Sequence, residues 1–538
     1  MLELPFPLAG PMPAWRSVFA WFALVPLIAA VLSQPVIEGP RPLRRAFLLA
    51  YVCGILWYAG NCYWIYDTML LHGGLPPVVS ALLLVGYSLV LGLYFGLFGW
   101  GVALIRRNTG STRLALFFAP FLWAALELAA ARITSVPWDQ LGYSQVDNGL
   151  VSQLAPWTGV YGISFVLVAV NGLIAGGLVI ERCAAKRIWG IAGTVLAVAG
   201  TAGIFLTPPR PAATATAVLV QPNLDVAGDN TWAGTEWDKH IAEFNRLAVE
   251  SASKDKTYIA GIPESGAALG EIIPPPYPAR PDLVVWPESP APFIEADPRY
   301  QQMLVTLARQ VQAPLVVGNL GTDYSAEDRA WRDYNSALVI GVDGSRVGRY
   351  DKIHLVPFGE YIPFKKVIFF AHKLTGRVSE FSRGEQRKVF RLPTANGQAH
   401  RYGIFICYES VFADEVREFA ELGAEVLVNV SDDGWYGDTS APWQHLNMVR
   451  MRAIENRRWI LRDTNNGVTS VIDPYGRVRQ SIARHQVDAL PASYGFRDDV
   501  TYYTAHGDTF AWLCVVVALG LIGWAVRKLR FAKINQVG

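Results

Sequence analysis

The sequence predicts a polytopic α-helical membrane domain joined to an extracytoplasmic α/β domain. Only 17% of the 538 residues are charged, whereas about 25% is usual for globular proteins. The deficit lies in the first 207 residues, which hold 18 charged residues against 74 in the remaining 331. Long apolar segments fill the first part, and apolar β-rich runs alternate with helical segments in the second. The formal net charge of +2 argues against nucleic acid as a partner.

Seven segments are long and apolar enough to cross a bilayer as helices, which satisfy their own backbone hydrogen bonds. No basic stretch precedes the first segment, so we expect no cleaved signal peptide and a retained Met1. The segments are approximately residues 15–33, 46–66, 78–105, 114–131, 151–180, 188–207 and 510–526.

Basic residues gather in alternate loops, which predicts that these loops are cytoplasmic. The remaining loops carry only Arg132. The long segment between spans six and seven must then lie outside the cytoplasm, which in a bacterium is the periplasmic face of the inner membrane. The basic loop residues are Arg41, Arg44, Arg45, Arg106, Arg107, Arg113, Arg182, Lys186, Arg187, Arg527, Lys528, Arg530 and Lys533.

These patterns divide the chain into four parts. We expect a bundle of six spans at 1–207, a linker at 208–216, a periplasmic catalytic domain at 217–500, and a transmembrane helix with a basic cytoplasmic tail at 501–538. Buried strands are predicted at 217–221, 283–286, 315–317, 336–340, 402–406 and 426–429. Helices are predicted at 300–311, 414–422 and 445–459. This alternation is typical of α/β domains.

Glu127 lies inside the fourth predicted span, where a charged side chain is costly. It is therefore a functional candidate. The alternative is a carboxylate near the outer interface that pairs with Arg132.

Reactive residue types follow the predicted strands. Glu288 and Cys407 each come just after an apolar run, and Lys352 and Glu360 lie in one block after the strand at 336–340. The other four cysteines lie in or beside spans, so Cys407 is alone in the soluble part. An unpaired cysteine in an oxidising compartment indicates a reactive thiol. Such a thiol needs a base and an oxyanion donor, which a carboxylate and a lysine supply.

The order of these residues resembles the nitrilase, or carbon–nitrogen hydrolase, superfamily. The resemblance rests on the Trp286-Pro-Glu288 turn, the block at 351–360 and the Cys407-Tyr-Glu409 elbow. Together with the spans and the segments 431–438 and 442–445, the sequence is more narrowly similar to the apolipoprotein N-acyltransferases. It departs from that family in having seven spans where eight are usual, and Asp432 where Asn is usual.

The resemblance implies a nitrilase-like α-β-β-α sandwich and an acyltransferase. The enzyme would move an acyl chain from the sn-1 position of a membrane phospholipid to the α-amine of S-diacylglyceryl-cysteine on an apolipoprotein, through a thioester on Cys407 in a ping-pong cycle. Glu288 would be the general base, Lys352 the oxyanion donor, and Glu360 a residue that orients the lysine or the amine. The residues expected to shape the pocket are Tyr408, Glu409, Trp232 and Trp435.

The expected partners are the phospholipid donor and the apolipoprotein acceptor, and we expect a monomer. No cofactor and no metal are expected, because the eight histidines are scattered and no pair shows ligand spacing. Residues 365–373 are predicted either to dip into the bilayer or to form a core helix. The alternative enzyme is a membrane-tethered nitrilase-type amidase that hydrolyses small amides, and a non-enzymatic alternative is a channel or transporter with a sensory domain.

Overall fold

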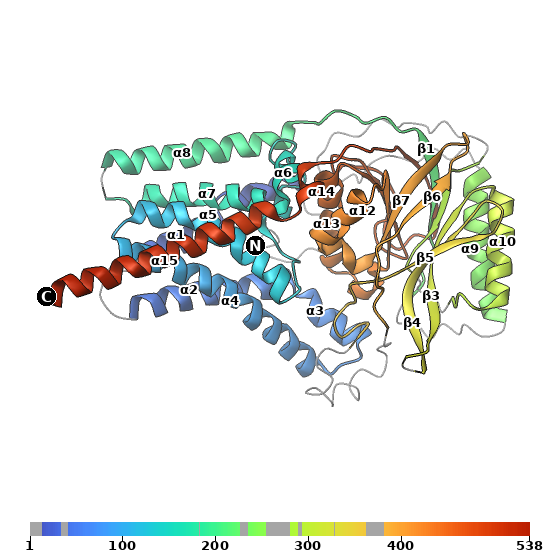
Figure 1. The fold of residues 1–538 in the computed structure, drawn as a ribbon, viewed down its shortest axis with the longest axis horizontal. Coiled ribbons are helices and arrows are strands. Elements are labelled where there is room, and N and C mark those ends of the chain that lie inside the picture. Colours follow the sequence, from blue (N-terminus) through green and yellow to red (C-terminus); the bar gives the residue numbers. More distant parts are fainter. Residues whose placement is uncertain are drawn as a thin grey trace. The chain divides into compact units, whose positions relative to one another are not determined.

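The computed structural model describes residues 13–33, 41–181, 183–225, 235–253, 280–288, 293–327, 329–361 and 381–537. The chain forms two compact units (Figure 1). The first, the helical unit, comprises Met1–Tyr66, Ala81–Pro208 and His506–Gly538. The second, the α/β unit, comprises Asp67–Ser80 and Pro209–Ala505. The calls at Trp232 and at residues 365–373 lie outside the described residues.

Among the described residues, six helical segments are long and apolar enough to cross a membrane, and a bent pair of helices makes a seventh if it is counted as one span. The bent pair is α2 (Arg41–Asn61) with Trp64–His72, at an angle of 53°, and it contains α3 (Trp64–Asp67) and η2 (Thr68–His72). The polytopic helical architecture is thus confirmed. The six segments are Trp15–Leu32, which contains η1 (Ala14–Trp21) and α1 (Val25–Leu32), α4 (Pro77–Thr109), α5 (Thr112–Ile133), α7 (Val160–Val179), Cys183–Phe205, which contains α8 (Cys183–Ala202) and η5 (Gly203–Phe205), and the part of α15 (Thr509–Val537) up to Lys528.

Two predicted spans differ in detail from the structure. The span at 46–66 is interrupted between Asn61 and Trp64, and the span at 151–180 begins as the short helices η4 (Val151–Leu154) and α6 (Ala155–Thr158). Gly159 has a φ of +62°, outside the right-handed helical region, and α7 starts only after it. The apolar composition of these segments did not reveal the breaks.

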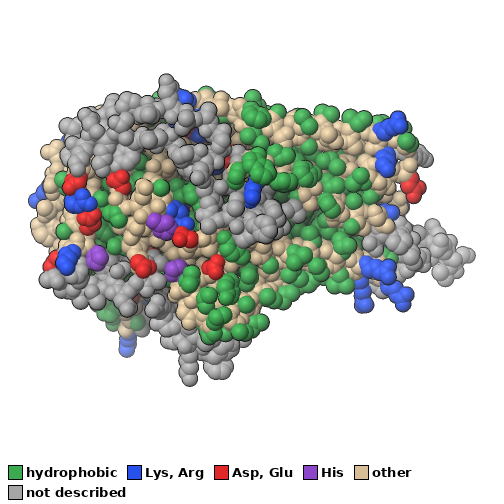
Figure 2. Space-filling model, turned by 180° about the vertical axis from the view of Figure 1, so that it is seen from behind, with side chains coloured by type: hydrophobic (Ala, Val, Ile, Leu, Met, Phe, Trp, Pro, Cys, Tyr) green, Lys and Arg blue, Asp and Glu red, His purple; other side chains and the backbone are tan. Residues whose placement is uncertain are grey.

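The surface of the helical unit is apolar, as expected for helices in contact with lipid. Figure 2 shows hydrophobic side chains spread over this unit and Lys and Arg side chains gathered at its right-hand end. Ile188, Val516 and Leu519 are each more than 60% exposed. α7 and α8 pack closely, because a Cβ atom on Gly177 would lie 2.6 Å from the Cα of Gly190.

Glu127 is held by neutral donors, and the alternative of a pairing with Arg132 is wrong. Its carboxylate accepts hydrogen bonds from Trp123 Nε1 at 2.8 Å and from Ser164 Oγ at 3.0 Å. Arg132 forms an ion pair with Asp508 at 2.6 Å, at the start of the last helix. Glu127 therefore joins α5 to α7 within the helical unit.

The α/β unit contains two six-stranded sheets, whose strand orders are β12-β1-β2-β3-β4-β5 and β11-β10-β9-β8-β7-β6. The inner triplets β1-β2-β3 and β7-β8-β9 are parallel, and the other neighbours are antiparallel. The first sheet comprises β1 (Ala215–Gln221), β2 (Leu283–Trp286), β3 (Leu315–Ser325), β4 (Ala330–Ile340), β5 (Arg346–Asp351) and β12 (Asp488–Tyr494), and the second comprises β6 (Val389–Pro393), β7 (Ala399–Ile406), β8 (Val426–Ser431), β9 (Trp459–Thr464), β10 (Ser470–Ile472) and β11 (Val478–Ser481).

The two sheets form the middle of a four-layer α-β-β-α sandwich, so the predicted fold class is confirmed. Alternate residues of β1 show this directly: Leu219 packs in the core between the sheets, whereas Val218 and Val220 pack against the helices. On the outer face of the first sheet lie α9 (Thr235–Ser253) and α10 (Pro298–Val311). The second sheet carries α12 (Ala413–Glu421) and α13 (Ala441–Asn456), and α14 (Tyr502–His506) follows β12 (Figure 1).

The helices predicted at 300–311 and 414–422 agree with observed helices to within two residues, and each of the six predicted strands lies inside an observed strand. The predictions at 315–317 and 336–340 are too short, because β3 continues to Ser325 and β4 begins at Ala330. The helix predicted at 445–459 is wrong at its end, because α13 stops at Asn456 and Trp459 begins β9. Arg457 adopts the left-handed conformation, with a φ of +53°, and this terminates the helix.

Candidate active site

Cys407 stands at a sharp turn where β7 ends. The strand is buried from Tyr402 to Ile406, and Cys407 is the first residue of the short helix η6 (Cys407–Val411). Its φ of +48° is left-handed, which is unfavourable for a residue with a Cβ atom. Because β7 and β8 are parallel and Ile406 pairs with Val430, Cys407 lies beside Ser431 at the carboxyl end of the sheet. Chemistry in α/β folds is usually found at this edge.

Lys352 lies between two buried carboxylates. Its Nζ is 3.0 Å from Glu288 Oε1 and 2.9 Å from Glu360 Oε1. The side chain of Lys352 is only 1% exposed. Asn335 Nδ2 donates to the same two carboxylates, at 2.7 Å and 2.6 Å. The second oxygen of Glu288 accepts the backbone N–H of Asp432 at 2.9 Å. The structure therefore brings Glu288, Lys352 and Glu360 into one cluster.

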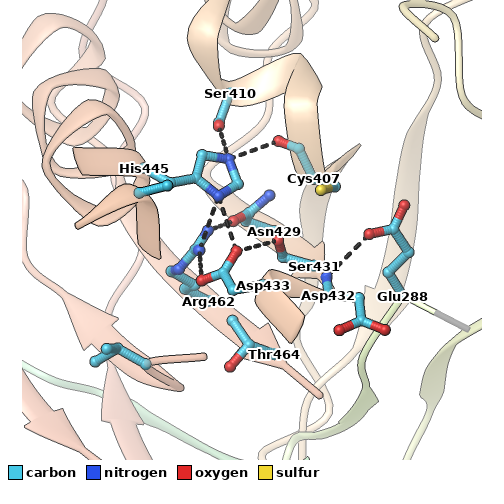
Figure 3. Close-up of polar contacts among 12 residues, drawn as sticks. Glu288, Cys407, Ser410, Asn429, Ser431, Asp432, Asp433, His445, Arg462 and Thr464 are labelled. Carbon is cyan, nitrogen blue, oxygen red and sulfur yellow. Dashed lines mark hydrogen bonds and ion pairs between the residues drawn. The ribbon is translucent and has the colours of Figure 1, made fainter. Parts of the chain in front are cut away.

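The Cys407 thiol belongs electrostatically to this cluster. Figure 3 shows its sulfur directed toward the Glu288 carboxylate. Burial and the charge of Glu288 raise the pKa of Cys407 well above its ordinary value, and Lys352 opposes this shift. Cys407 is therefore a thiol at neutral pH and needs a base to become a nucleophile. Burial lowers the pKa of Lys352, but Glu288 and Glu360 outweigh it and raise that pKa, so the amine stays charged.

Glu409 connects the backbone segments that carry the nucleophile and the lysine. It accepts the backbone N–H of Ile406, the residue before Cys407, at 2.7 Å. It also accepts the backbone N–H of Ile353, the residue after Lys352, at 2.8 Å. The hydroxyl of Tyr350 donates to it at 2.7 Å. Glu409 is 2% exposed, so these contacts fix the backbone around the site. This differs from the expected place on a pocket wall.

The two aromatic candidates that the structure describes differ in exposure. Tyr408 is buried, and its ring packs against Phe412 at 5.4 Å and His354 at 6.0 Å between centroids. Trp435 is 44% exposed and makes an edge contact with His72 at 5.9 Å. Trp435 thus offers an apolar surface close to the loop after β8, whereas Tyr408 supports the turn.

Sequence reasoning missed two groups of residues at this site. Asn335 lies in the middle of β4, where no motif marks it, and it bridges Glu288 and Glu360. Asp433 and His445 lie in segments that contributed to the resemblance, but no role was predicted for them. His445 Nε2 is 3.1 Å from the Cys407 carbonyl oxygen, and its Nδ1 is 2.9 Å from Asp433 Oδ1. The available signal was their place in the segments 431–438 and 442–445, which belong to the resemblance.

Asp432 stands where the family usually has Asn, and its surroundings favour the uncharged form of its side chain. Its Oδ1 accepts hydrogen bonds from Gly434 N at 3.0 Å and from Asn465 Nδ2 at 3.2 Å. Burial and the charge of Glu288 raise its pKa well above the ordinary value. A protonated Asp has the size of Asn and accepts the same hydrogen bonds.

We expect Asp432→Asn to stabilise the protein at neutral pH. Because the folded pKa is raised, the wild-type protein loses the stability contributed by this proton as pH rises from the unfolded value of about 4 toward the folded value. Asn does not titrate. Thermal unfolding at pH 5 to 8 should therefore show the melting temperature of the variant moving further above that of the wild type as pH increases. A gap that is constant with pH, or that narrows, would contradict a protonated Asp432.

The cluster has the parts that covalent acyl transfer needs. A thiol faces a carboxylate that can take its proton, and a fixed ammonium group lies beside that carboxylate. Within the described ranges, no group of three or more His, Cys, Asp or Glu side chains could hold a metal ion.

The fold and the Cys–Lys–Glu cluster define the second unit as a carbon–nitrogen hydrolase domain, and the family described as "Carbon-nitrogen hydrolase" matches residues 219–485. The family "Apolipoprotein N-acyltransferase N-terminal domain" matches residues 6–173. An "Apolipoprotein N-acyltransferase" of Geobacter metallireducens is 34% identical, over 98% of this chain and 94% of that protein. The chain therefore belongs to the apolipoprotein N-acyltransferase family and is a multi-pass membrane protein.

A protein of the same name from Pseudomonas putida is 31% identical, over 94% of this chain and 93% of that protein. Among solved structures, a carbon–nitrogen hydrolase from Helicobacter pylori G27 is 18% identical, with a TM-score of 0.35, and covers 52% of this chain and 88% of that chain.

Proposed function

We propose that this protein is the acyltransferase that completes lipoprotein maturation. It takes the sn-1 acyl chain of a membrane phospholipid and transfers it to the α-amine of S-diacylglyceryl-cysteine at the N-terminus of an apolipoprotein. The observation that carries the proposal is the burial of Lys352 between Glu288 and Glu360, beside Cys407, in a chain of this family. Full-length similarity to proteins named apolipoprotein N-acyltransferase favours this function over the amidase alternative.

In the first half-reaction, Glu288 takes the thiol proton and the Cys407 sulfur attacks the ester carbon. The resulting oxyanion is stabilised by the Lys352 ammonium and by the backbone N–H of Tyr408. When the C–O bond breaks, Glu288 returns the proton to the leaving alkoxide, so that a lysophospholipid departs and a thioester remains. The raised pKa of Cys407 is the reason that a base in direct reach is required.

In the second half-reaction, the α-amine of the acceptor attacks the thioester. Glu288 accepts the proton that the amine loses and passes it to the departing Cys407 sulfur, which restores the starting thiol. Glu360 keeps Lys352 oriented, since both its oxygens are already bonded, to Lys352 and to the backbone N–H of Val356. Trp435 is 44% exposed and offers an apolar surface that a lipid chain can contact.

We further propose that the protein lies in the bacterial inner membrane with its catalytic unit in the periplasm. Basic residues support this orientation, because they occur at the start of α2, the end of α4, and the start of α5 and α8. Both substrates are then anchored in the leaflet next to the catalytic unit, and confinement to a surface raises their effective concentration.

The products of the reaction test this proposal. Purified full-length protein is incubated in liposomes with a phospholipid labelled in its sn-1 chain and a peptide that begins with diacylglyceryl-cysteine. We expect an N-acylated peptide and a lysophospholipid in equal amounts, and little free fatty acid. Labelled fatty acid released at the same rate with and without the peptide would show that water is the acceptor, and would contradict acyl transfer.

A further inference from the structure

A buried polar cluster lies on the backbone side of the nucleophile, away from its sulfur. Figure 3 shows the Cys407 carbonyl directed toward His445, whereas the sulfur is directed toward Glu288. We refer to Ser410, Asp433, His445 and Arg462 as the His445 cluster. Each of its members is fully buried, and none of them has a role in the two half-reactions above. Buried polar and charged groups are costly to keep, so a cluster of this size needs an explanation.

His445 lies at the centre of the cluster, on α13. Its Nε2 is 3.1 Å from the Cys407 carbonyl oxygen and 2.6 Å from Ser410 Oγ. Its Nδ1 is 2.9 Å from Asp433 Oδ1, and Arg462 Nη2 forms an ion pair with the other oxygen of Asp433 at 2.6 Å. Ser431 Oγ also donates to Asp433 Oδ1, at 3.1 Å. The Nδ1 side of the imidazole ring thus contacts Asp433, and the Nε2 side contacts the backbone carbonyl of the nucleophile Cys407.

The contact with Cys407 determines where His445 carries a proton. The Cys407 carbonyl oxygen and the Asp433 carboxylate can only accept, so both contacts are hydrogen bonds when the ring carries hydrogens on Nε2 and Nδ1, as in its charged form. Asp433 is ionised, because Arg462 and His445 outweigh its burial and lower its pKa. Burial and Arg462 lower the pKa of His445, while Asp433 and the Cys407 carbonyl oppose them. The carbonyl therefore helps to retain the proton on the nitrogen that faces it.

This hydrogen bond acts on the least favourable backbone conformation of the site. Cys407 has a left-handed φ of +48°, a conformation that is unfavourable for a residue with a side chain. A left-handed conformation of a residue with a side chain persists only when its surroundings impose it. The carbonyl of Cys407 is the group whose direction changes if the residue relaxes to a right-handed or extended conformation, and it is the group that His445 holds.

The base is held by the same loop. Asp432 donates its backbone N–H to Glu288 Oε2 at 2.9 Å, and the next residue, Asp433, binds the ring of His445. Two adjacent residues after β8 therefore connect the general base to the backbone of the nucleophile. Displacement of His445 would change the position of the thiol relative to Glu288 without removing either group.

We propose that His445 is a positioning residue for acyl transfer: its Nε2–H holds the Cys407 carbonyl in the left-handed turn, and Asp433 holds the ring. The inference rests on the proposed function, because it concerns the step in which Cys407 attacks the donor ester. It assigns to His445 no contact with the substrate.

Two substitutions test the contacts of the two ring nitrogens separately. The amide nitrogen of Gln occupies nearly the position of Nε2, and that of Asn occupies nearly the position of Nδ1. His445→Gln therefore keeps a donor for Cys407 and loses the Asp433 contact, whereas His445→Asn does the reverse. Both variants are prepared as full-length protein, and the rate of acyl-enzyme formation is measured as a function of phospholipid concentration.

We expect His445→Asn to lower the maximal rate of acylation by about 10- to 100-fold, with the half-saturating phospholipid concentration unchanged within about twofold. His445→Gln should recover most of the rate, although each variant loses one buried contact and both should melt below the wild type. Equal rates in the two variants, following their loss of thermal stability, would show a purely structural role and overturn the proposal. A change confined to the half-saturating concentration would also overturn it.

A second measurement does not depend on the substrate. The resting protein is treated with iodoacetamide, and the rate at which Cys407 is alkylated reports the position and environment of its sulfur. We expect His445→Asn to change this rate at least about threefold and His445→Gln to change it less. If the wild-type protein forms no acyl-enzyme, the proposed function fails. The ratio of the alkylation rates of the two variants still decides whether His445 positions the thiol. Equal rates in both variants would reject the positioning role of His445.

Discussion

We expect the Cys407→Ala protein to form no acyl-enzyme and to lose acyl transfer by about 10⁴-fold or more. The sulfur is the only atom of the cluster that can hold the acyl chain between the two half-reactions, so no other side chain replaces it. Transfer to a diacylglyceryl-cysteine peptide, measured with a labelled phospholipid, tests this. Because alanine is smaller and Cys407 is 5% exposed, we expect only a modest change in thermal stability.

Cys183→Ala is the matched control for this substitution. Cys183 is exposed and begins α8, in the helical unit. We expect the control to transfer acyl chains at the wild-type rate. Transfer by Cys407→Ala within tenfold of the wild type would exclude a covalent mechanism at this residue.

The second large effect concerns Lys352, which balances two buried carboxylates. We expect Lys352→Met to reduce acylation by at least about 10²- to 10³-fold, because the oxyanion loses its ammonium donor. The same substitution leaves Glu288 and Glu360 without a cation in a site that is almost fully buried. Removal of one partner of a buried ion pair costs about 3–5 kcal/mol, so chemical denaturation should show a drop of that size in the free energy of unfolding.

A double variant separates the two consequences. Lys352→Met combined with Glu360→Gln removes the cation together with one of the two carboxylates that it neutralised. We expect the double variant to regain part of the lost stability and none of the lost activity. Recovery of activity along with stability would mean that Lys352 serves only to maintain the fold.

The sequence was sufficient for the parts of the fold that depend on composition and periodicity. Buried runs such as 283–286 and 402–406 are strands in the structure, because strands covered on both faces are continuously apolar. The four edge strands and the inner strands β9 and β10 were missed. β5 (Arg346–Asp351) and β11 (Val478–Ser481) carry charged and polar residues and are only partly buried, so their composition resembles that of loops.

The helical unit shows a similar limit. Hydropathy located the spans, because lipid imposes an apolar surface on them, but it did not locate the break at Gly159 or the bend after Asn61. Pairing by proximity in sequence was also misleading, since Arg132 forms its ion pair with Asp508, 376 residues away, and Glu127 accepts hydrogen bonds from Trp123 and Ser164.

At the candidate site, the sequence identified the residues whose chemistry is recognisable and missed those whose role is geometric. Glu288, Lys352 and Cys407 have reactive side chains after apolar runs, and the structure gathers them. Asn335 contributes two side-chain hydrogen bonds from the middle of a strand, and His445 acts through a backbone carbonyl. Such roles depend on which strands and helices meet, and a single sequence does not reveal this.

The most direct test of the account is the fate of the acyl chain on the enzyme. Full-length protein is mixed with a phospholipid of defined acyl chains and without an acceptor, and the digested protein is analysed by mass spectrometry. The account predicts one added acyl chain on the peptide that contains Cys407, removed by hydroxylamine and lost when the diacylglyceryl-cysteine peptide is added, at the rate at which product forms. An acyl chain on another residue, or product formed at full rate with Cys407 never modified, would contradict it.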